Sequence, residues 1–204
     1  MVIPAPPFTP KRQEIADAAL HLIGRRGIAA LTMASLAEEL GVSPGAPFRH
    51  FASREEILDA VARRVEELIS ATLPDPTLPP LVRLERLFLD RARTVGKHAG
   101  IARLVFSEQF SLALPKTAAD RLHGLVKRTR ASVLEALEEA AQEGSIRCDI
   151  PLEALQTVVV GSLQHMVFLG AMTPAIKKKP DAKEVFQVLM RLLEPLPARS
   201  REGL

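Results

Sequence analysis

The chain has 204 residues, of which 47% are hydrophobic, so it is long enough for one or two domains with a substantial core. Its formal net charge of +3 is too small to indicate nucleic-acid binding by itself. The single cysteine, Cys148, excludes an intramolecular disulfide and a cysteine-based metal site, and it fits a reducing cytoplasm.

The first ten residues are rich in proline and lack the basic start and apolar core of a signal peptide. We expect residues 1–10 to form a flexible arm. The most apolar stretch, Val158–Met172, is interrupted by Ser162, Gln164 and His165, and we expect it to be too short to span a bilayer. The sequence therefore predicts a cytoplasmic protein that does not enter a membrane.

Helical periodicity dominates the chain, and no strand-like alternation is sustained. Apolar residues spaced three and four apart predict a helix over Lys11–Arg26. A short helix is predicted over Met33–Leu40, with Thr32 as its N-cap. Gly41 follows it, at the position where a left-handed residue commonly ends a helix.

Two further helices are predicted directly after this turn. The first covers residues 43–51, with Ser43 as N-cap and Pro44 at the first helical position, where a missing N–H costs nothing. Ser53 and Glu56 have the spacing of a capping box and predict the start of the next helix.

Four prolines between Leu73 and Pro80 cannot continue a helix, so they predict a stiff linker. We expect one domain over residues 11–72 and a second over 81–204. Five more helices are predicted in the second domain, over about Leu81–Lys97, His98–Leu112, Thr117–Glu143, Pro151–Met172 and Asp181–Leu196. The expected fold is all-α, with about nine helices.

The segments 33–40 and 43–51, joined by a glycine-containing turn, have the pattern of a helix-turn-helix, whose second helix can enter the major groove. Many helical hairpins have such a turn, so the pattern alone leaves DNA binding open. A longer set of fixed spacings includes Thr32, Leu36-Ala37, Gly41-Val42-Ser43, Gly45, Phe48, His50-Phe51 and Ser53-Arg54-Glu55. Between Gln13 and Val61 this order resembles the signature of the TetR/AcrR family. The resemblance implies a three-helix DNA-binding domain followed by a helical domain that binds a ligand and dimerises.

The resemblance also implies which side chains meet DNA. They are Thr32, Ser43, Pro44, Gly45, Phe48, Arg49, His50 and Arg54. Arg49 is able to read a guanine or to hold a phosphate, whereas Thr32 and Ser43 could serve only as helix caps. The family usually has Tyr in place of Phe48 and Lys in place of Arg54. Phe48 can pack only against sugar or a thymine methyl, and Arg54 keeps its positive charge.

In the family, the last two helices form a four-helix dimer interface, and the helices before them enclose a ligand pocket. The helix predicted over 151–172 is apolar nearly all round, which favours burial by its own domain and by a second copy; a deeply buried helix of a monomer is the alternative. The predicted interface residues are Val159, Leu163, Val167, Phe186, Leu189 and Leu193.

A ligand pocket is predicted within the second domain. Its predicted lining is Phe88, Phe106, Phe110, His123, Val126, His165 and Met166, each of which could instead belong to an ordinary core. Because the chain has neither Trp nor Tyr, an apolar ligand is favoured.

No pattern in the sequence indicates catalysis: it has no glycine-rich phosphate loop, no H-E-x-x-H and no G-x-S-x-G. We therefore expect neither an enzyme nor a metal or cofactor. The expected function is that of a homodimeric repressor, released from a near-palindromic double-stranded operator by a small, apolar ligand. A DNA-bound adaptor controlled by a protein partner and a transcriptional activator are the alternatives.

Overall fold

The structure, a computed structural model, describes residues 9–106, 112–171 and 180–195, which contain eight α-helices and no strand. The all-α class predicted from the sequence is therefore confirmed. Two short 3-10 turns, η1 and η2, accompany the helices. The elements are α1 (Pro10–Arg26), η1 (Ile28–Ala30), α2 (Met33–Leu40), η2 (Pro47–Arg49), α3 (Arg54–Ser70), α4 (Pro80–Val95), α5 (Ala99–Phe106), α7 (Lys116–Gln142), α8 (Leu152–Ala171) and α9 (Ala182–Leu193).

The predicted caps fix the helix ends near the N-terminus. The Thr32 side chain accepts from the Ser35 N–H at 3.1 Å, and the Ser35 hydroxyl accepts from the Thr32 N–H, which completes a capping box on α2. Gly41 ends α2 with φ of +64°, in the left-handed region. Ser53 caps α3, but the Glu56 carboxylate accepts from the N–H of Ala52, one residue earlier than a capping box requires.

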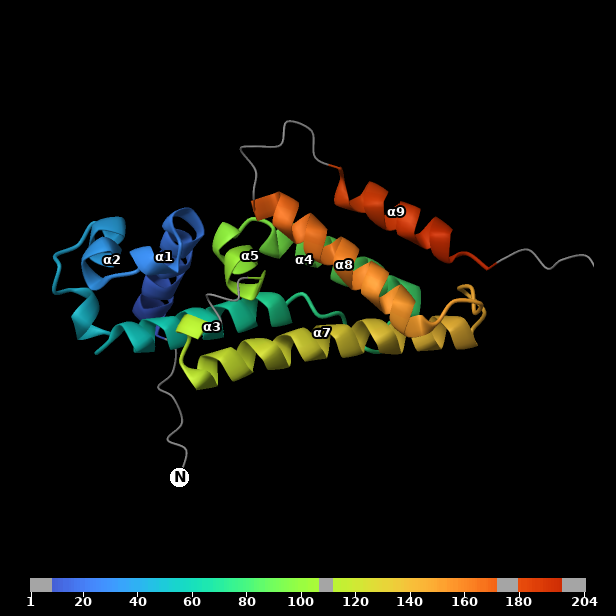
Figure 1. The fold of residues 1–204 in the computed structure, drawn as a ribbon, viewed down its shortest axis with the longest axis horizontal. Coiled ribbons are helices and arrows are strands. Elements are labelled where there is room, and N and C mark those ends of the chain that lie inside the picture. Colours follow the sequence, from blue (N-terminus) through green and yellow to red (C-terminus); the bar gives the residue numbers. More distant parts are fainter. Residues whose placement is uncertain (1–8, 107–111, 172–179, 196–204) are drawn as a thin grey trace, which may run out of the picture.

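The helices form an elongated bundle with α1, α2 and the first part of α3 at one end (Figure 1). The helix α3 then runs alongside α7, and α9 lies on the outer side of α8 (Figure 1). Since α1 also packs against α5, one hydrophobic cluster joins the N-terminal helices to α5 and the first half of α7. A second cluster fills the space between α4, α7, α8 and α9. The hydrophobic core therefore continues across the proline-rich segment at 73–80.

The predicted helix over 43–51 does not form as an α-helix. Pro47 stands where the first α-helical N–H would donate to the Ser43 carbonyl, and proline has no N–H. The Ser43 carbonyl accepts from Ala46 instead, at 2.9 Å, and the segment continues as the 3-10 turn η2. The prediction recognised Pro44, whose N–H is dispensable, but it missed the effect of Pro47.

Residues 152–170 of α8 form a continuous helix that is long and apolar enough, by length and composition, to cross a membrane. This corrects the expectation that the apolar stretch is too short. The core helix of a soluble protein has the same composition, and here 44% of these residues are buried against the rest of the chain. The helix therefore has one buried face and one apolar face that no part of the described chain covers.

Candidate DNA-binding surface and ligand cavity

The segment between α2 and α3 presents most of the predicted DNA-contacting residues at one end of the molecule. Of the predicted residues in this segment, Ser43, Pro44, Gly45, Phe48 and Arg49 are exposed, and His50 is half-buried. The Phe48 side chain is 55% exposed, which is unusual for a phenylalanine. Pro47 and Phe51 point inward and are buried. The turn therefore offers an apolar ring and a cation together to a partner.

Arg12 of α1 holds this segment in place. Its Nη1 donates to the His50 carbonyl, and its guanidinium lies over the Phe51 ring, 4.1 Å from the ring centroid. Arg12 thus supplies a donor to the carbonyl of His50, the residue that follows η2. The sequence gives no signal that distinguishes Arg12, because a basic residue in the first turn of a helix is usually solvated.

Two of the predicted contacts have structural partners. The Thr32 hydroxyl is part of the α2 capping box, although its side chain remains exposed. Arg54 donates from Nε to the Leu31 carbonyl at 2.9 Å and from Nη2 to the Ile28 carbonyl at 3.0 Å. These bonds tie the start of α3 to the chain before α2. A phosphate contact from either residue stays a prediction.

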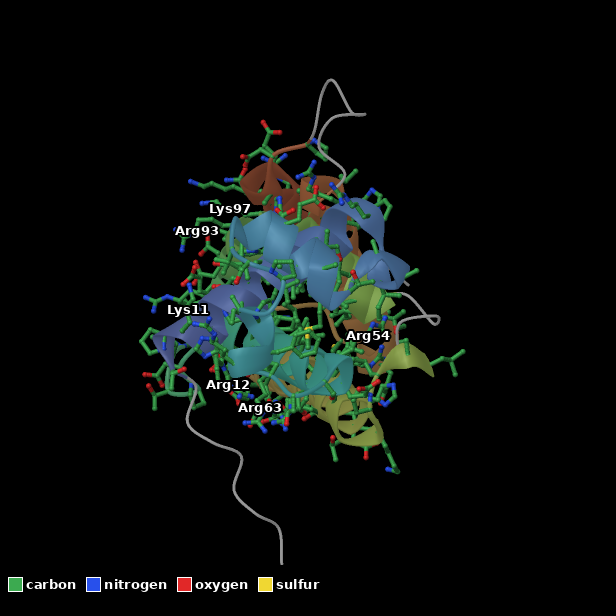
Figure 2. All side chains as sticks on the ribbon, turned by 90° about the vertical axis from the view of Figure 1, so that its left-hand side faces the viewer. Lys11, Arg12, Arg54, Arg63, Arg93 and Lys97 are labelled. Atoms are coloured by element: carbon green, nitrogen blue, oxygen red, sulfur yellow. The ribbon has the colours of Figure 1, made fainter. Side chains whose placement is uncertain are left out.

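Figure 2 views the molecule from the end that holds α1, α2 and the start of α3, and labels Lys11, Arg12, Arg54 and Arg63 of α1 and α3, with Arg93 of α4 and Lys97 just after it. Part of this charge is neutralised, since Lys11 pairs with Glu14 and Arg63 pairs with Asp59, each at 2.9 Å. The positive field is therefore moderate, in keeping with the small net charge.

A mostly apolar cavity, partly open to solvent, lies among α3, α4, α5, α7 and α8. Small-molecule sites commonly have mostly apolar walls with a few polar groups. The apolar lining of this cavity is Ile69, Val95, Ile101, Ala102, Val105, Leu125, Val126, Val160, Leu163 and Val167. Its polar lining is Arg91, Thr129, Arg130 and Gln164. The cavity adjoins Ile69, one residue before α3 ends, and so lies next to the helix that carries the DNA-binding end.

Among the predicted pocket residues whose side chains the structure describes, Val126 alone lines this cavity. Phe88 is buried in the second hydrophobic cluster, 5.6 Å from Phe186 between ring centroids. His123 is exposed and lines a second hollow, which Val126 also lines. His165 and Met166 line a shallow depression on the outer face of α8.

Two other predicted pocket residues, Phe110 and the side chain of Phe106, lie outside the described residues. The described residues of the predicted pocket are therefore divided among three hollows and the filled core. Helical spacing identifies buried residues but does not distinguish a cavity wall from a filled core.

The dimer prediction is corrected in its choice of residues. The chain buries all six of them in its own core: Val159, Leu163, Val167, Phe186, Leu189 and Leu193. Exposed apolar residues lie instead on the opposite faces of the same two helices. They are Val158, Phe168, Val188 and Leu192, each between 44% and 60% exposed. An all-round apolar helix gives no periodic signal for which face is outermost, so the sequence did not resolve this point.

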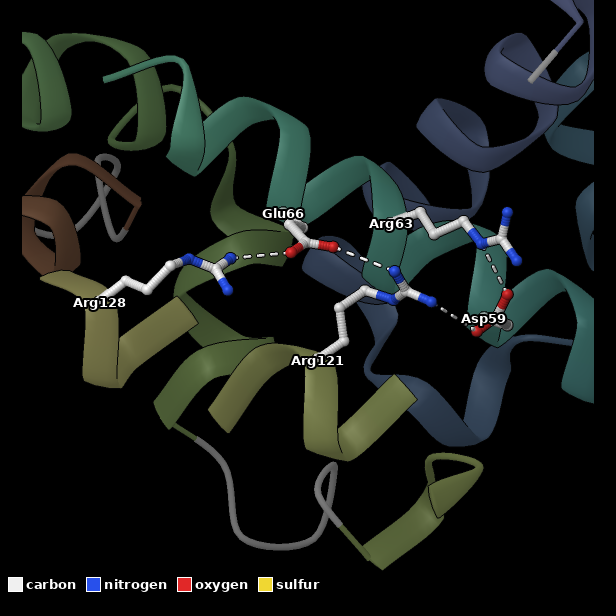
Figure 3. A network of polar contacts seen from close by, with 5 residues as sticks. All are labelled: Asp59, Arg63, Glu66, Arg121 and Arg128. Carbon is white, nitrogen blue, oxygen red and sulfur yellow. Dashed lines mark hydrogen bonds and ion pairs between the residues drawn. The ribbon is translucent and has the colours of Figure 1, made fainter. Parts of the chain in front are cut away.

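An ion-pair network joins α3 to α7, as Figure 3 shows. Glu66 of α3 accepts from Arg121 at 3.2 Å and from Arg128 at 2.8 Å, both on α7. Arg121 also lies 3.9 Å from Asp59, which accepts from Arg63 at 2.9 Å. The network fixes the DNA-binding end relative to the helix that forms one wall of the cavity.

Comparison with known proteins agrees with this arrangement. Residues 15–61 match the family described as "Bacterial regulatory proteins, tetR family". The HTH-type transcriptional repressor KstR2 of Mycobacterium tuberculosis is 24% identical over 146 residues, which are 70% of this chain and 72% of that protein. The HTH-type transcriptional regulator BetI of Rhizobium meliloti is 42% identical over 53 residues, 26% of each chain.

Two solved structures share the fold over nearly the whole chain. The ketosteroid transcriptional regulator KstR2 of Mycobacterium tuberculosis has a TM-score of 0.73 at 21% identity, over 95% of this chain and 97% of the other. AibR, in complex with isovaleryl coenzyme A and operator DNA, has a TM-score of 0.72 at 15% identity, over 90% and 98%. Residues 15–61 therefore match the tetR family of bacterial regulatory proteins, and nearly the whole chain shares its fold with these two solved structures.

Proposed function

We propose that the protein is a dimeric transcriptional repressor, which binds a near-palindromic operator and releases it when a small molecule fills the cavity beside Ile69. The observation that carries the proposal is the position of α3. The exposed segment 43–50 directly precedes the N-terminal end of α3, and the C-terminal end of α3 adjoins the cavity. KstR2 is named a repressor, and AibR is named in complex with both a coenzyme A ester and operator DNA.

The DNA contacts proposed for this chain come from the exposed turn. Phe48 would pack against sugar or a thymine methyl, and Arg49 would bind a phosphate or a guanine edge. The end of one copy that carries the exposed turn has few unpaired cations. Strong binding to DNA therefore requires two copies acting together. A twofold dimer would place two such segments about 34–36 Å apart, in successive major grooves.

The dimer is proposed to form through the exposed apolar faces of α8 and α9. Val188 and Leu192 are one helical turn apart on α9, and Val158 and Phe168 are exposed on α8. Replacing Leu192 by Asp should shift the protein towards monomer in light scattering at micromolar concentration. A wild-type protein that is monomeric under the same conditions would contradict the dimer.

Ligand binding is proposed to act through the connections between α3 and the rest of the bundle. If the ligand moves α7 relative to α3, the Glu66 network transmits the change to the DNA-binding end. A coupling free energy of about 1–3 kcal/mol, which is typical of allostery, would weaken operator binding between several-fold and about a hundredfold.

The test begins with selection of binding sites from random double-stranded DNA, followed by fluorescence anisotropy on the selected site and on a scrambled one. The expected result is a twofold-symmetric site with a clear preference over scrambled DNA. Arg49→Ala should weaken this binding, whereas Arg86→Ala, at an exposed position of α4, should not. Equal and steeply salt-dependent binding to both DNAs would contradict the proposal.

A further inference from the structure

The cavity contains a buried cation, Arg91, with no acidic partner among the residues that the structure describes. Arg91 of α4 is only 7% exposed and lines the cavity. Its Nε donates to the Thr72 hydroxyl at 2.5 Å, but its terminal nitrogens have only long contacts, 3.3 Å to the Ile69 carbonyl and 3.5 Å to the Thr129 hydroxyl. Over the part of the chain that the structure describes, no carboxylate lies within ion-pair distance of this guanidinium.

A second buried arginine on the same helix, Arg83, has the carboxylate partner that Arg91 lacks among the described residues. Arg83 is 3% exposed, and its Nη2 donates to the Glu139 carboxylate. That ion pair raises the pKa of Arg83, whereas burial alone lowers the pKa of Arg91 to about 10. A buried charge without a counter-ion is costly, and such groups are usually paired. The difference between the two arginines is that Arg91 faces the cavity.

The remaining cavity wall fits an apolar ligand with one acidic end. Ten of the fourteen lining residues are apolar, and none is acidic. Arg91 is the deeply buried charge, while Arg130 and Gln164 are exposed residues at the edge. One buried guanidinium balances one negative charge, which suits a carboxylate better than a doubly charged phosphate monoester.

We infer that the effector is an amphipathic monocarboxylate, whose acid group binds Arg91 and whose apolar body lies against the α5, α7 and α8 walls of the cavity. This inference rests on the proposed function and names its ligand class. The contact would be a charge-assisted hydrogen bond in a low-dielectric site, which is among the stronger polar interactions in proteins. The sequence predicts an apolar ligand, and the buried Arg91 narrows this class to apolar ligands that carry an acid group.

The same guanidinium gives the ligand a direct route to α3. Arg91 now binds the Ile69 carbonyl and the Thr72 hydroxyl, and that hydroxyl itself donates to the Ile69 carbonyl at 2.7 Å. These groups form the C-terminal end of α3, where a cation is favourable. A ligand carboxylate would compete for the guanidinium donors, and the last turn of α3 would lose this attachment.

Direct binding to the full-length protein, measured by calorimetry without DNA, tests the ligand class. The probes are decanoate and 4-cyclohexylbutanoate, each compared with its methyl ester and its corresponding alcohol. The acids should bind at least about tenfold more tightly than their neutral counterparts. Arg91→Gln should abolish this preference, and Arg91→Lys should retain part of it. Arg93→Gln, an exposed position on the same helix, should leave it unchanged.

Each outcome decides the inference. Equal binding of acids and esters, no binding of either acid up to millimolar concentration, or a preference that survives in Arg91→Gln would overturn it. Thermal unfolding of each variant establishes whether it is folded. If Arg91→Gln does not fold, Arg91→Lys still tests the contribution of Arg91 to the preference for acids. Acids that bind tightly without releasing the selected operator would contradict the repressor mechanism, and leave the ligand class standing. Release of the operator by the neutral probes alone would contradict the ligand class and leave the repressor mechanism standing.

Discussion

A Cβ atom built on Gly100 would stand 2.2 Å from the carbonyl oxygen of Leu20, so α5 packs directly on the backbone of α1. Leu20 belongs to the DNA-binding end, and Gly100 belongs to the helices around the cavity. The two regions are therefore in close contact, with no side chain between them at this point. A contact with backbone on one side cannot be relieved by a change of rotamer.

Replacing Gly100 by Ala should separate α5 from α1. We expect a loss of about 1–3 kcal/mol in the free energy of unfolding, as for other overpacked sites. Thermal or urea unfolding would measure it. Gly124→Ala is the matched control, since the new methyl would meet only the Arg128 side chain at 3.5 Å. That substitution, within α7, should be neutral or stabilise by up to about 1 kcal/mol. Equal stability of the two variants would contradict the close packing.

Arg12→Met should weaken operator binding without removing a phosphate contact. The substitution keeps much of the apolar stem but loses the hydrogen bond to the His50 carbonyl and the charge over the Phe51 ring. If Arg12 only positions the turn, the affinity falls while the dependence of log K on log salt concentration keeps its slope. A lost phosphate contact would instead reduce that slope by about 0.9. Lys11→Met, at an exposed neighbouring position, is the control.

The N-terminal end of the fold could be predicted well because its determinants are local. Thr32, Gly41 and Ser53 act within one turn of the chain, through side-chain caps and a positive φ, and all three occupy the predicted positions. The apolar stripe of α1 is also local. These features need no knowledge of the partner helices, so periodicity and capping rules were sufficient.

The cavity could not be predicted in the same way, because its character depends on which long-range partners a side chain has. Arg83 and Arg91 both lie on the apolar stripe of α4, with Leu84, Leu87 and Val95, and this spacing was a usable signal of burial. The sequence does not show that Glu139, 56 residues later, neutralises Arg83, or that Arg91 has no such partner within the described ranges 9–106, 112–171 and 180–195. The two arginines differ in whether they form an ion pair with a residue distant in the sequence, and not in residue type.

The stability of the protein should decrease as the pH falls below the ordinary pKa of histidine because of His98. Burial is the main cause that lowers the pKa of His98 below its usual value of 6.5, and the positive charges of Arg64 and Lys97 act in the same direction. Asp17 opposes them. The unfolded chain therefore binds a proton at higher pH than the folded chain, so the free energy of unfolding falls as the pH drops through 6.5 and on through the folded pKa.

Urea unfolding between about pH 5 and pH 8, at one protein concentration, measures this effect through the histidine pKa range. Other groups titrate over part of this range, so the difference between wild type and His98→Gln isolates His98. The variant should lose less stability than wild type on acidification. Parallel pH profiles for the two proteins would show that His98 is not protonated more readily in the unfolded chain.

Pro47→Ala should convert the exposed turn into a longer α-helix. Alanine restores the N–H that can donate to the Ser43 carbonyl, which now accepts from Ala46. A proline inside a helix costs about 3 kcal/mol, so its removal should slow amide exchange in residues 46–51 by about tenfold or more. A helical turn would also re-aim Phe48 and Arg49. The selected operator sequence should therefore change, beyond any general loss of affinity.

Pro44→Ala is the matched control, because Pro44 stands where a helical N–H has no partner within the helix. It should leave amide exchange in residues 46–51 unchanged, so that slower exchange in Pro47→Ala can be assigned to Pro47. Pro47 is buried, so the free energy of unfolding must be measured beside the exchange rates to separate local from global opening. Faster exchange in Pro47→Ala at unchanged global stability would mean that Pro47 stiffens the turn, and that the 3-10 geometry has another cause.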